Sequence, residues 1–151
     1  MGAGTATAAP YPAALLARIA AACERTPDRE ACGFVVRAAG GALDVVEVPN
    51  AAEEPRLAYL MDPDVLLATF ERLAREGADV VAVWHSHVEA PAAFSARDRE
   101  EALLDGEPAL PGAEYLVVSV RGGRAVETRR YVFGGTGFVE APLTGTAASP
   151  A

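Results

Sequence analysis

Histidine, cysteine and tryptophan are scarce in this chain of 151 residues, which holds two histidines, two cysteines and one tryptophan. Two cysteines are too few to indicate a disulfide-stapled secreted domain. We expect Cys23 and Cys32 to be small buried side chains, and a metal-ligand or nucleophile role for Cys32 stays open. A zinc deaminase would need P-C-x-x-C after H-x-E, and the chain has no C-x-x-C.

Long apolar runs and clustered basic residues are also missing. No stretch of 18 or more apolar residues is present, so we expect no membrane span. The formal net charge is −8, and nucleic-acid binding needs clustered Lys and Arg, so we expect no nucleic-acid partner. The adjacent basic pair Arg129-Arg130 is interpreted as a solvated strand end. No phosphate-binding glycine motif occurs, and the glycine pairs predict hairpin turns.

The size and composition favour one globular domain. Hydrophobic residues make up 51% of the chain, enough for a proper core. We expect a domain over residues 10–142 between flexible tails at 1–9 and 143–151. The first residues lack a basic segment followed by an apolar one, so we expect no secretory signal and a cytoplasmic protein. The oligomeric state is left open.

The pattern of apolar residues and turns predicts an α/β domain with a mixed, largely antiparallel sheet flanked by helices. Helices are predicted over 12–25, where Leu15, Ile19 and Ala22 form an apolar stripe, over 63–77 after an Asp62 cap, and from Ser95 onward. Strands are predicted at about 32–38, 43–48, 57–61, 78–84, 114–120, 124–133 and 138–140. Residues 104–112 are expected to be an irregular connection.

Both histidines lie at the end of the apolar strand 78–84, as His85-Ser86-His87. Side chains alternate along a strand, so His85 and His87 face the same side and can converge on one ion. Asp98 is the obvious third ligand, and catalytic zinc typically leaves a fourth position for water. The pattern therefore predicts a hydrolytic Zn²⁺ site; the alternative is a pair of ordinary polar residues at a strand end.

Ser95 and Asp98 also have a simpler interpretation. A serine followed three residues later by an acidic residue, before a helical pattern, is typical of a helix N-cap with a capping box. The spacing after His85-Ser86-His87 favours the metal site over this interpretation.

A hydrolytic zinc site needs a general base to accept the proton of the attacking water. Glu30 is the best candidate, because it stands at the entrance of an apolar strand, in Glu30-Ala31-Cys32-Gly33-Phe34. Other acidic residues compete, and sequence spacing alone does not exclude them: Glu24, Glu53, Glu54 and Glu89.

Together, Glu30 and the pattern H-S-H-x7-S-x2-D resemble the JAMM (JAB, or MPN-plus) zinc metalloproteases over most of residues 11–142. The resemblance implies that His85, His87 and Asp98 bind zinc. It also implies that Glu30 is the general base, that Ser95 stabilises the oxyanion, and that Ser86 is structural. The implied fold is similar to that of cytidine deaminases.

The chain departs from many relatives at two loop positions, where proline is replaced by Val88 and Phe94. These changes bear on the shape of the substrate groove rather than on the metal ligands.

The resemblance also implies a substrate class. We expect hydrolysis of an amide bond at the C-terminus of a ubiquitin-like or sulfur-carrier protein ending in Gly-Gly, with release of a cysteine or a trailing peptide. One alternative is removal of a ubiquitin-like modifier from target lysines in a bacterial conjugation pathway. A second alternative is a non-catalytic interaction module, which would usually lack one or more of the ligands.

Overall fold

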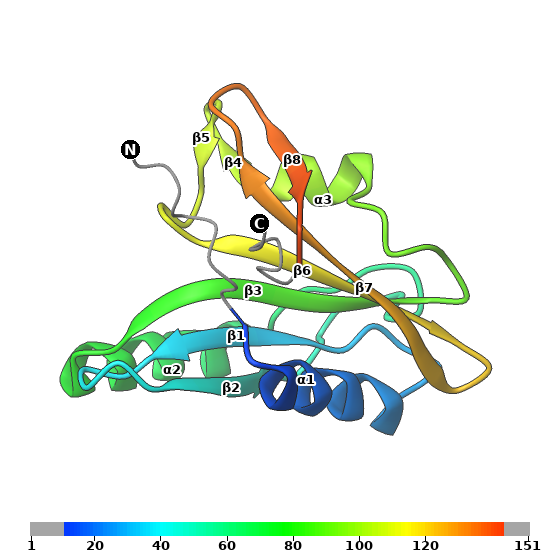
Figure 1. Ribbon diagram of the computed structural model, residues 1–151, viewed down its shortest axis with the longest axis horizontal. Coiled ribbons are helices and arrows are strands. Elements are labelled where there is room, and N and C mark those ends of the chain that lie inside the picture. The colour runs from blue at the N-terminus through cyan, green and yellow to red at the C-terminus, as the bar shows by residue number, and fades with distance from the viewer. Residues whose placement is uncertain (1–10, 144–151) are drawn as a thin grey trace, which may run out of the picture.

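The computed structural model describes residues 11–143, and it is built on one six-stranded sheet (Figure 1). The strand order is β2-β1-β3-β6-β7-β8, in which β3 and β6 are parallel and all other neighbours are antiparallel. The predicted mixed, largely antiparallel sheet is therefore confirmed. The strands are β1 (Cys32–Arg37), β2 (Leu43–Val48), β3 (Asp79–Val88), β6 (Glu114–Arg121), β7 (Arg124–Phe133) and β8 (Phe138–Ala141).

Helices cover both faces of this sheet. Side chains alternate along the strands, so apolar residues of β1 point to both faces and pack under helices on each. On β1, Val35 packs in a cluster with the apolar stripe of α1 (Ala13–Arg25). Its neighbours Phe34 and Val36 pack in a second cluster with residues of α2 (Pro63–Glu76) and of the segment around α3 (Ala96–Glu101). The domain is thus three-layered, and α3 lies on the same face as α2.

The helix boundaries follow from the predicted caps. The Asp62 carboxylate accepts hydrogen bonds from the backbone N–H groups of Asp64 and Val65, and Pro63 occupies the first turn. Gly77 ends α2 in the left-handed region, at φ 68°, where glycine carries no Cβ penalty. On α1, the predicted stripe of Leu15, Ile19 and Ala22 is buried.

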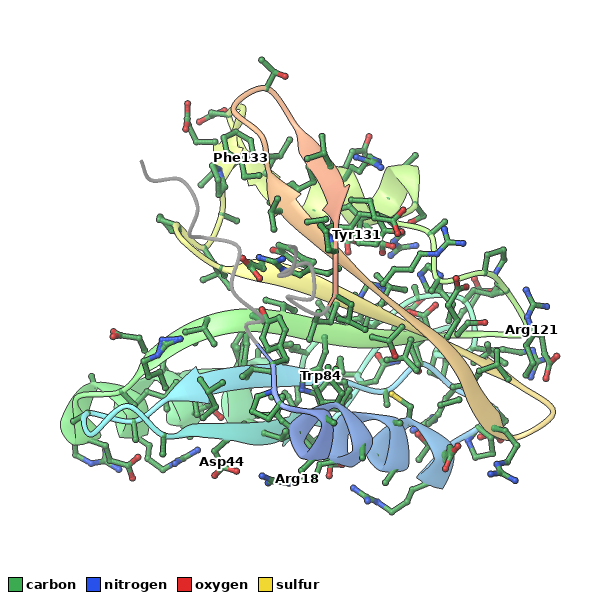
Figure 2. The ribbon with its side chains drawn as sticks, viewed as in Figure 1. Arg18, Asp44, Trp84, Arg121, Tyr131 and Phe133 are labelled. Atoms are coloured by element: carbon green, nitrogen blue, oxygen red, sulfur yellow. The ribbon has the colours of Figure 1, made fainter. Side chains whose placement is uncertain are left out.

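Gly33 is required by the packing between β1 and its neighbours. A Cβ at this position would lie 2.0 Å from the Val46 carbonyl oxygen and 2.6 Å from a ring carbon of Trp84. The Trp84 ring therefore lies flush against the backbone of β1, and its indole N–H donates to the Phe34 carbonyl oxygen at 3.1 Å. Trp84 is fully buried on the α1 face (Figure 2). Ser86 lies two residues further along the strand and is also buried, so strand alternation places it on the same face.

Three sequence interpretations were wrong. Residues 57–61 form no strand and make one isolated bridge, from Met61 to Asn50; the Asn50 side chain occupies the backbone groups of Ala58 and Leu60 instead. The connection after α3 contains a small hairpin, β4 (Leu103–Leu104) and β5 (Glu107–Pro108). Arg130 is not at a solvated strand end: it lies within β7, its side chain is 11% exposed, and it forms a two-bonded ion pair with Glu114.

Both cysteines are buried and free, as expected. No helix among residues 11–143 is long and apolar enough to cross a membrane. The predicted tails at 1–9 and 143–151 lie outside the described residues, except for Leu143, which packs against the α1-side cluster.

Candidate metal centre and active site

Strand β3 delivers the two histidines to one face of the sheet. The strand continues through Val88, so His85 and His87 both lie on the face covered by α2 and α3. Ser86 faces the other way, and its hydroxyl accepts the Ala31 N–H at 2.8 Å. The Ser86 N–H in turn donates to the Ala31 carbonyl oxygen at 3.0 Å. This pairing places Glu30, the residue before Ala31, beside the end of β3.

The loop after β3 is anchored by its own carbonyl oxygens. The Ala90 carbonyl accepts the Ser119 hydroxyl at 2.6 Å, and the Ala92 carbonyl accepts the Tyr131 hydroxyl at 2.8 Å. Phe94 is buried and stacks on Tyr131, with ring centroids 5.1 Å apart. Aromatic packing at Phe94 therefore fixes the loop between β3 and α3.

Helix α3 brings Asp98 to the histidines. Ser95 is the N-cap: its hydroxyl accepts the Asp98 N–H at 3.0 Å, and the Asp98 carboxylate accepts the Ser95 N–H at 3.0 Å. The capping box considered as the simpler interpretation is thus present. The same carboxylate also reaches both imidazoles, so the capping box is compatible with the predicted metal site and holds Asp98 beside the two histidines.

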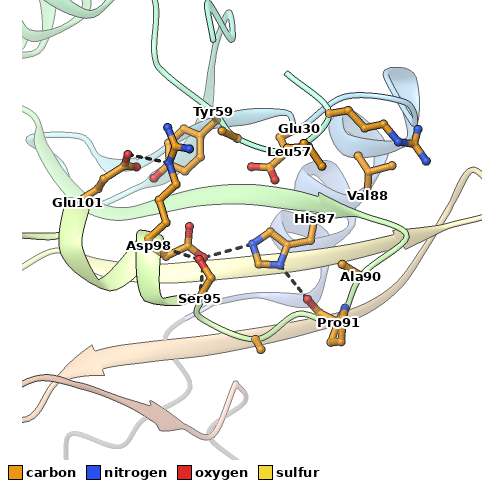
Figure 3. Close-up of a pocket in the computed structure, with 14 residues that line it drawn as sticks. Glu30, Leu57, Tyr59, His87, Val88, Ala90, Pro91, Ser95, Asp98 and Glu101 are labelled. Carbon is orange, nitrogen blue, oxygen red and sulfur yellow. Dashed lines mark hydrogen bonds and ion pairs between the residues drawn. The ribbon is translucent and has the colours of Figure 1, made fainter. Parts of the chain in front are cut away.

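His85, His87 and Asp98 form one buried group whose candidate ligand atoms all lie within 4.8 Å of one another. The two Nε2 atoms are 3.2 Å apart. The His85 Nε2 lies 3.3 Å from Asp98 Oδ1, and the His87 Nε2 lies 3.2 Å from Asp98 Oδ2. The structure therefore brings together the three predicted ligands (Figure 3 shows His87 and Asp98).

The donor set fits a metal cation. The His87 Nδ1 lies 2.8 Å from the Pro91 carbonyl oxygen, which only accepts, so Nδ1 carries the proton and the neutral ring presents a lone pair at Nε2. That lone pair faces the Asp98 carboxylate. Electron-rich atoms at such distances need a proton or a cation between them, and two imidazole nitrogens with one carboxylate oxygen are ligands that zinc accepts.

Burial and mutual hydrogen bonds shift the pKa values of His85, His87 and Asp98. Burial lowers the pKa of His85, which is fully buried. Burial also acts to lower the pKa of His87, but its bonds to Asp98 and to the Pro91 carbonyl outweigh this and raise it. Burial acts to raise the pKa of Asp98, and hydrogen bonds from both histidines overcome it, so this pKa lies far below its usual range. Asp98 is therefore a carboxylate anion, as a ligand must be.

A pocket of about 320 Å³ opens in front of this group, and Glu30, His87, Ser95 and Asp98 all line it (Figure 3). Glu30 is buried, and burial raises its pKa to about 7, against the opposing effect of His87. The backbone of Glu30 is fixed on both sides: its N–H donates to the Pro55 carbonyl at 2.6 Å, and its carbonyl accepts from the Asn50 side chain at 2.9 Å.

The competing glutamates do not reach this pocket. Glu24 accepts the Ala125 N–H, and Glu89 accepts the Gly122 N–H. Glu53 and Glu54 are exposed and are not among the lining residues. Cys32 lies outside the buried metal-ligating group; its thiol donates to the Val48 carbonyl at 3.3 Å, and burial raises its pKa to about 12.

The sequence analysis missed several residues that line the pocket, among them Tyr59, Arg97 and Glu101. The Tyr59 ring stacks on His85, with centroids 4.5 Å apart. Arg97 and Glu101 pair with each other one turn apart on α3. The i, i+4 spacing of Arg97 and Glu101 was a usable signal, whereas nothing in the local sequence around Tyr59 indicates its contact with β3.

The chain belongs to the prokaryotic homologs of the JAB domain, because the model of that family matches residues 12–133. The predicted family is thereby confirmed. A 98-residue segment is 35% identical to a desampylase of Haloferax volcanii and covers 64% of this chain and 66% of that protein. A 58-residue segment is 45% identical to a probable TtuB-protein conjugate cleaving protease of Thermus thermophilus. This match covers 38% of this chain and 39% of that protein. The matches thus span less than two thirds of these relatives.

Solved structures show the same fold. The solution structure of a protein from Desulfitobacterium hafniense superposes with a TM-score of 0.64 at 24% identity, covering 85% of this chain and 86% of that one. The solution structure of a protein from Salinibacter ruber gives a TM-score of 0.59 at 26% identity, covering 89% of this chain and 88% of that one.

Proposed function

We propose that this protein is a zinc-dependent peptidase or isopeptidase. The observation that carries the proposal is the convergence of His85, His87 and Asp98 at a pocket whose other wall holds the buried carboxyl of Glu30. His85, His87 and Asp98 would hold Zn²⁺. Zinc supplies a Lewis acid that polarises a carbonyl and acidifies water.

Glu30 and Ser95 would perform the remaining chemistry. Glu30 takes a proton from the attacking water and returns it to the leaving amine; a carboxyl with a pKa near neutrality suits both directions of transfer. Ser95 keeps its hydroxyl proton available, because the oxygen accepts from the Asp98 N–H and donates to no residue in the described part of the chain. That proton can bind the developing oxyanion of the substrate.

The names of the relatives support a substrate class. Two of them are called desampylases and one a TtuB-conjugate cleaving protease, which supports a ubiquitin-like protein as partner here. We propose that the scissile amide lies at its Gly-Gly C-terminus, as in a sulfur carrier that bears a cysteine or a trailing peptide. The second candidate is the isopeptide bond to a target lysine, favoured by the word conjugate in the name of the Thermus relative.

Intact-mass spectrometry tests this proposal and separates the two bonds. One substrate is a ubiquitin-fold carrier with a C-terminal cysteine adduct, and the other is the same carrier linked to a lysine of a target protein. The enzyme itself contains no lysine, so every isopeptide seen belongs to the target. We expect wild type to cleave at least one substrate, and Glu30→Gln to bind zinc normally but lose turnover by about 10²–10⁴-fold.

Glu89→Gln is the matched control, because Glu89 is an exposed glutamate outside the pocket; we expect wild-type turnover from it. Near-normal cleavage by Glu30→Gln would show that another group is the base. Failure of zinc-loaded wild type to cleave either substrate would refute the substrate class.

A further inference from the structure

The two histidines of the metal group are held in different ways. A metal-binding histidine is usually oriented by a hydrogen bond from its other ring nitrogen. His87 has this bond, from Nδ1 to the Pro91 carbonyl. His85 does not: its Nδ1 is the one buried side-chain nitrogen or oxygen in residues 11–143 that lacks any hydrogen-bond partner.

The face of the His85 ring is occupied instead. The Tyr59 ring lies against it in a stacked arrangement, with an interplanar angle of 26° and centroids 4.5 Å apart. Tyr59 comes from the irregular segment between β2 and α2, so this contact joins a loop to the end of β3. A stacked aromatic ring restricts rotation of its neighbour, as a hydrogen bond at Nδ1 would otherwise do.

Asn50 holds Tyr59 in this position by binding the residues on both sides of it. Its side-chain NH₂ donates to the Ala58 carbonyl at 3.0 Å, and its side-chain oxygen accepts the Leu60 N–H at 3.0 Å. The same NH₂ group donates to the Glu30 carbonyl at 2.9 Å. One carboxamide therefore fixes the backbone of the proposed base and the backbone that presents Tyr59.

We propose that Tyr59 is the positioning residue for His85, and that Asn50 sets the place of both Tyr59 and Glu30. The inference rests on the proposed function, in which His85 binds zinc. Tyr59 itself binds no metal here; it acts by limiting the orientations of the His85 ring, so that Nε2 stays aimed at the group formed with His87 and Asp98.

Zinc affinity tests the role of Tyr59 without reference to turnover. The dissociation constant of zinc is measured by competition with a chromophoric chelator for wild type, Tyr59→Phe and Tyr59→Leu. We expect Tyr59→Phe to keep wild-type affinity because the ring remains. Tyr59→Leu should raise the dissociation constant about 10–100-fold, the usual effect of losing a partner that orients a ligand.

Leu60→Ala is the matched control, because Leu60 belongs to the same segment and its side chain is 56% exposed; its zinc affinity should equal that of wild type. Equal affinities of wild type and Tyr59→Leu would overturn the inference and leave the proposed hydrolase standing. Absence of cleavage by zinc-loaded wild type would remove the proposed function, while the affinities would still decide the role of Tyr59.

Asn50→Asp completes the test, since it keeps the acceptor for Leu60 but loses the donor to Ala58 and Glu30. We expect weaker zinc binding in this variant and a lower kcat with little change in KM.

The double variant Asn50→Asp with Tyr59→Leu tests whether Asn50 acts through Tyr59. Its loss of zinc affinity should be no greater than for Tyr59→Leu alone, because both changes act through one contact. Additive losses would show that Asn50 does not act through Tyr59. A cooperative thermal transition of each variant confirms that folded protein is compared.

Discussion

Single residues at this site have two tasks at once. Ser95 and Asp98 form a capping box that starts α3, and the same Asp98 carboxylate lies within 3.3 Å of both imidazole Nε2 atoms. The spacing of Ser95 and Asp98 is the same in the capping-box pattern and in the predicted metal-binding pattern. The reason is that the capping box turns the Asp98 carboxylate back toward the N-terminus of α3. The sequence alone presented these as alternatives; the geometry makes them one arrangement.

Replacing Ser95 by Ala separates these tasks. The helix loses its cap, so we expect the free energy of unfolding to fall by about 1 kcal/mol. Turnover should fall as well, because the hydroxyl proposed to bind the oxyanion is gone. Zinc binding should persist, since the Asp98 carboxylate is held by the backbone N–H of Ser95 and not by its side chain. Urea denaturation, zinc titration and conjugate cleavage measure the three effects.

Ser95→Thr is the control for this prediction, because threonine keeps both the cap and the hydroxyl. Loss of the zinc stoichiometry in Ser95→Ala would show that the side chain, and not the backbone, orients Asp98.

At the scale of helices and strands, elements with strong local signals could be predicted. The cap at Asp62 with Pro63 and the stop at Gly77 gave the bounds of α2, and the hairpin between β6 and β7 turns at Gly122 and Gly123 as expected. The convergence of His85, His87 and Asp98 could be predicted for the same reason, since strand alternation and a short loop bring these side chains together.

Elements that depend on a distant side chain could not be predicted. Residues 57–61 have strand-like composition, but Asn50 takes two of their backbone groups, so a ladder does not form. Tyr59 therefore reaches His85 through a loop whose shape no local pattern indicates. The β4–β5 hairpin was also missed, although Asp105 and Gly106 both have positive φ, the conformation that an Asp-Gly turn favours.

At the scale of the whole molecule, an ion-pair network ties the start of the described chain to strands β6 and β7. The Glu114 carboxylate on β6 accepts two hydrogen bonds from Arg130 on β7, each 2.8 Å, and one from the Tyr11 hydroxyl at 2.7 Å. Burial acts to raise the pKa of Glu114, but the bonds from Arg130 and Tyr11 outweigh it and hold the pKa below its ordinary value.

This network predicts a pH-dependent stability. A carboxylate whose pKa is lowered by folding stabilises the protein above its unfolded pKa, and the contribution is lost as the pH falls through the folded pKa. We expect Glu114→Gln to reduce the free energy of unfolding at pH 7 by about 2 kcal/mol, the scale of hydrogen bonds to a charged group. The difference from wild type should shrink on acidification below about pH 4.3, the ordinary glutamate pKa.

Urea denaturation at neutral and acidic pH measures this difference. Glu140→Gln is the control, because Glu140 is exposed and its Arg129 partner is 4.0 Å away, so its removal should change little. A gap between Glu114→Gln and wild type that stayed constant with pH would contradict the assignment.

The most direct test of the account is a zinc titration of metal-free wild type and of Asp98→Ala, followed by calorimetry. The account predicts one tightly bound zinc per wild-type chain and loss of that binding in Asp98→Ala, because two histidines alone make a weak site. Stoichiometric zinc in Asp98→Ala, or none in wild type, would contradict the claim that His85, His87 and Asp98 form the metal centre.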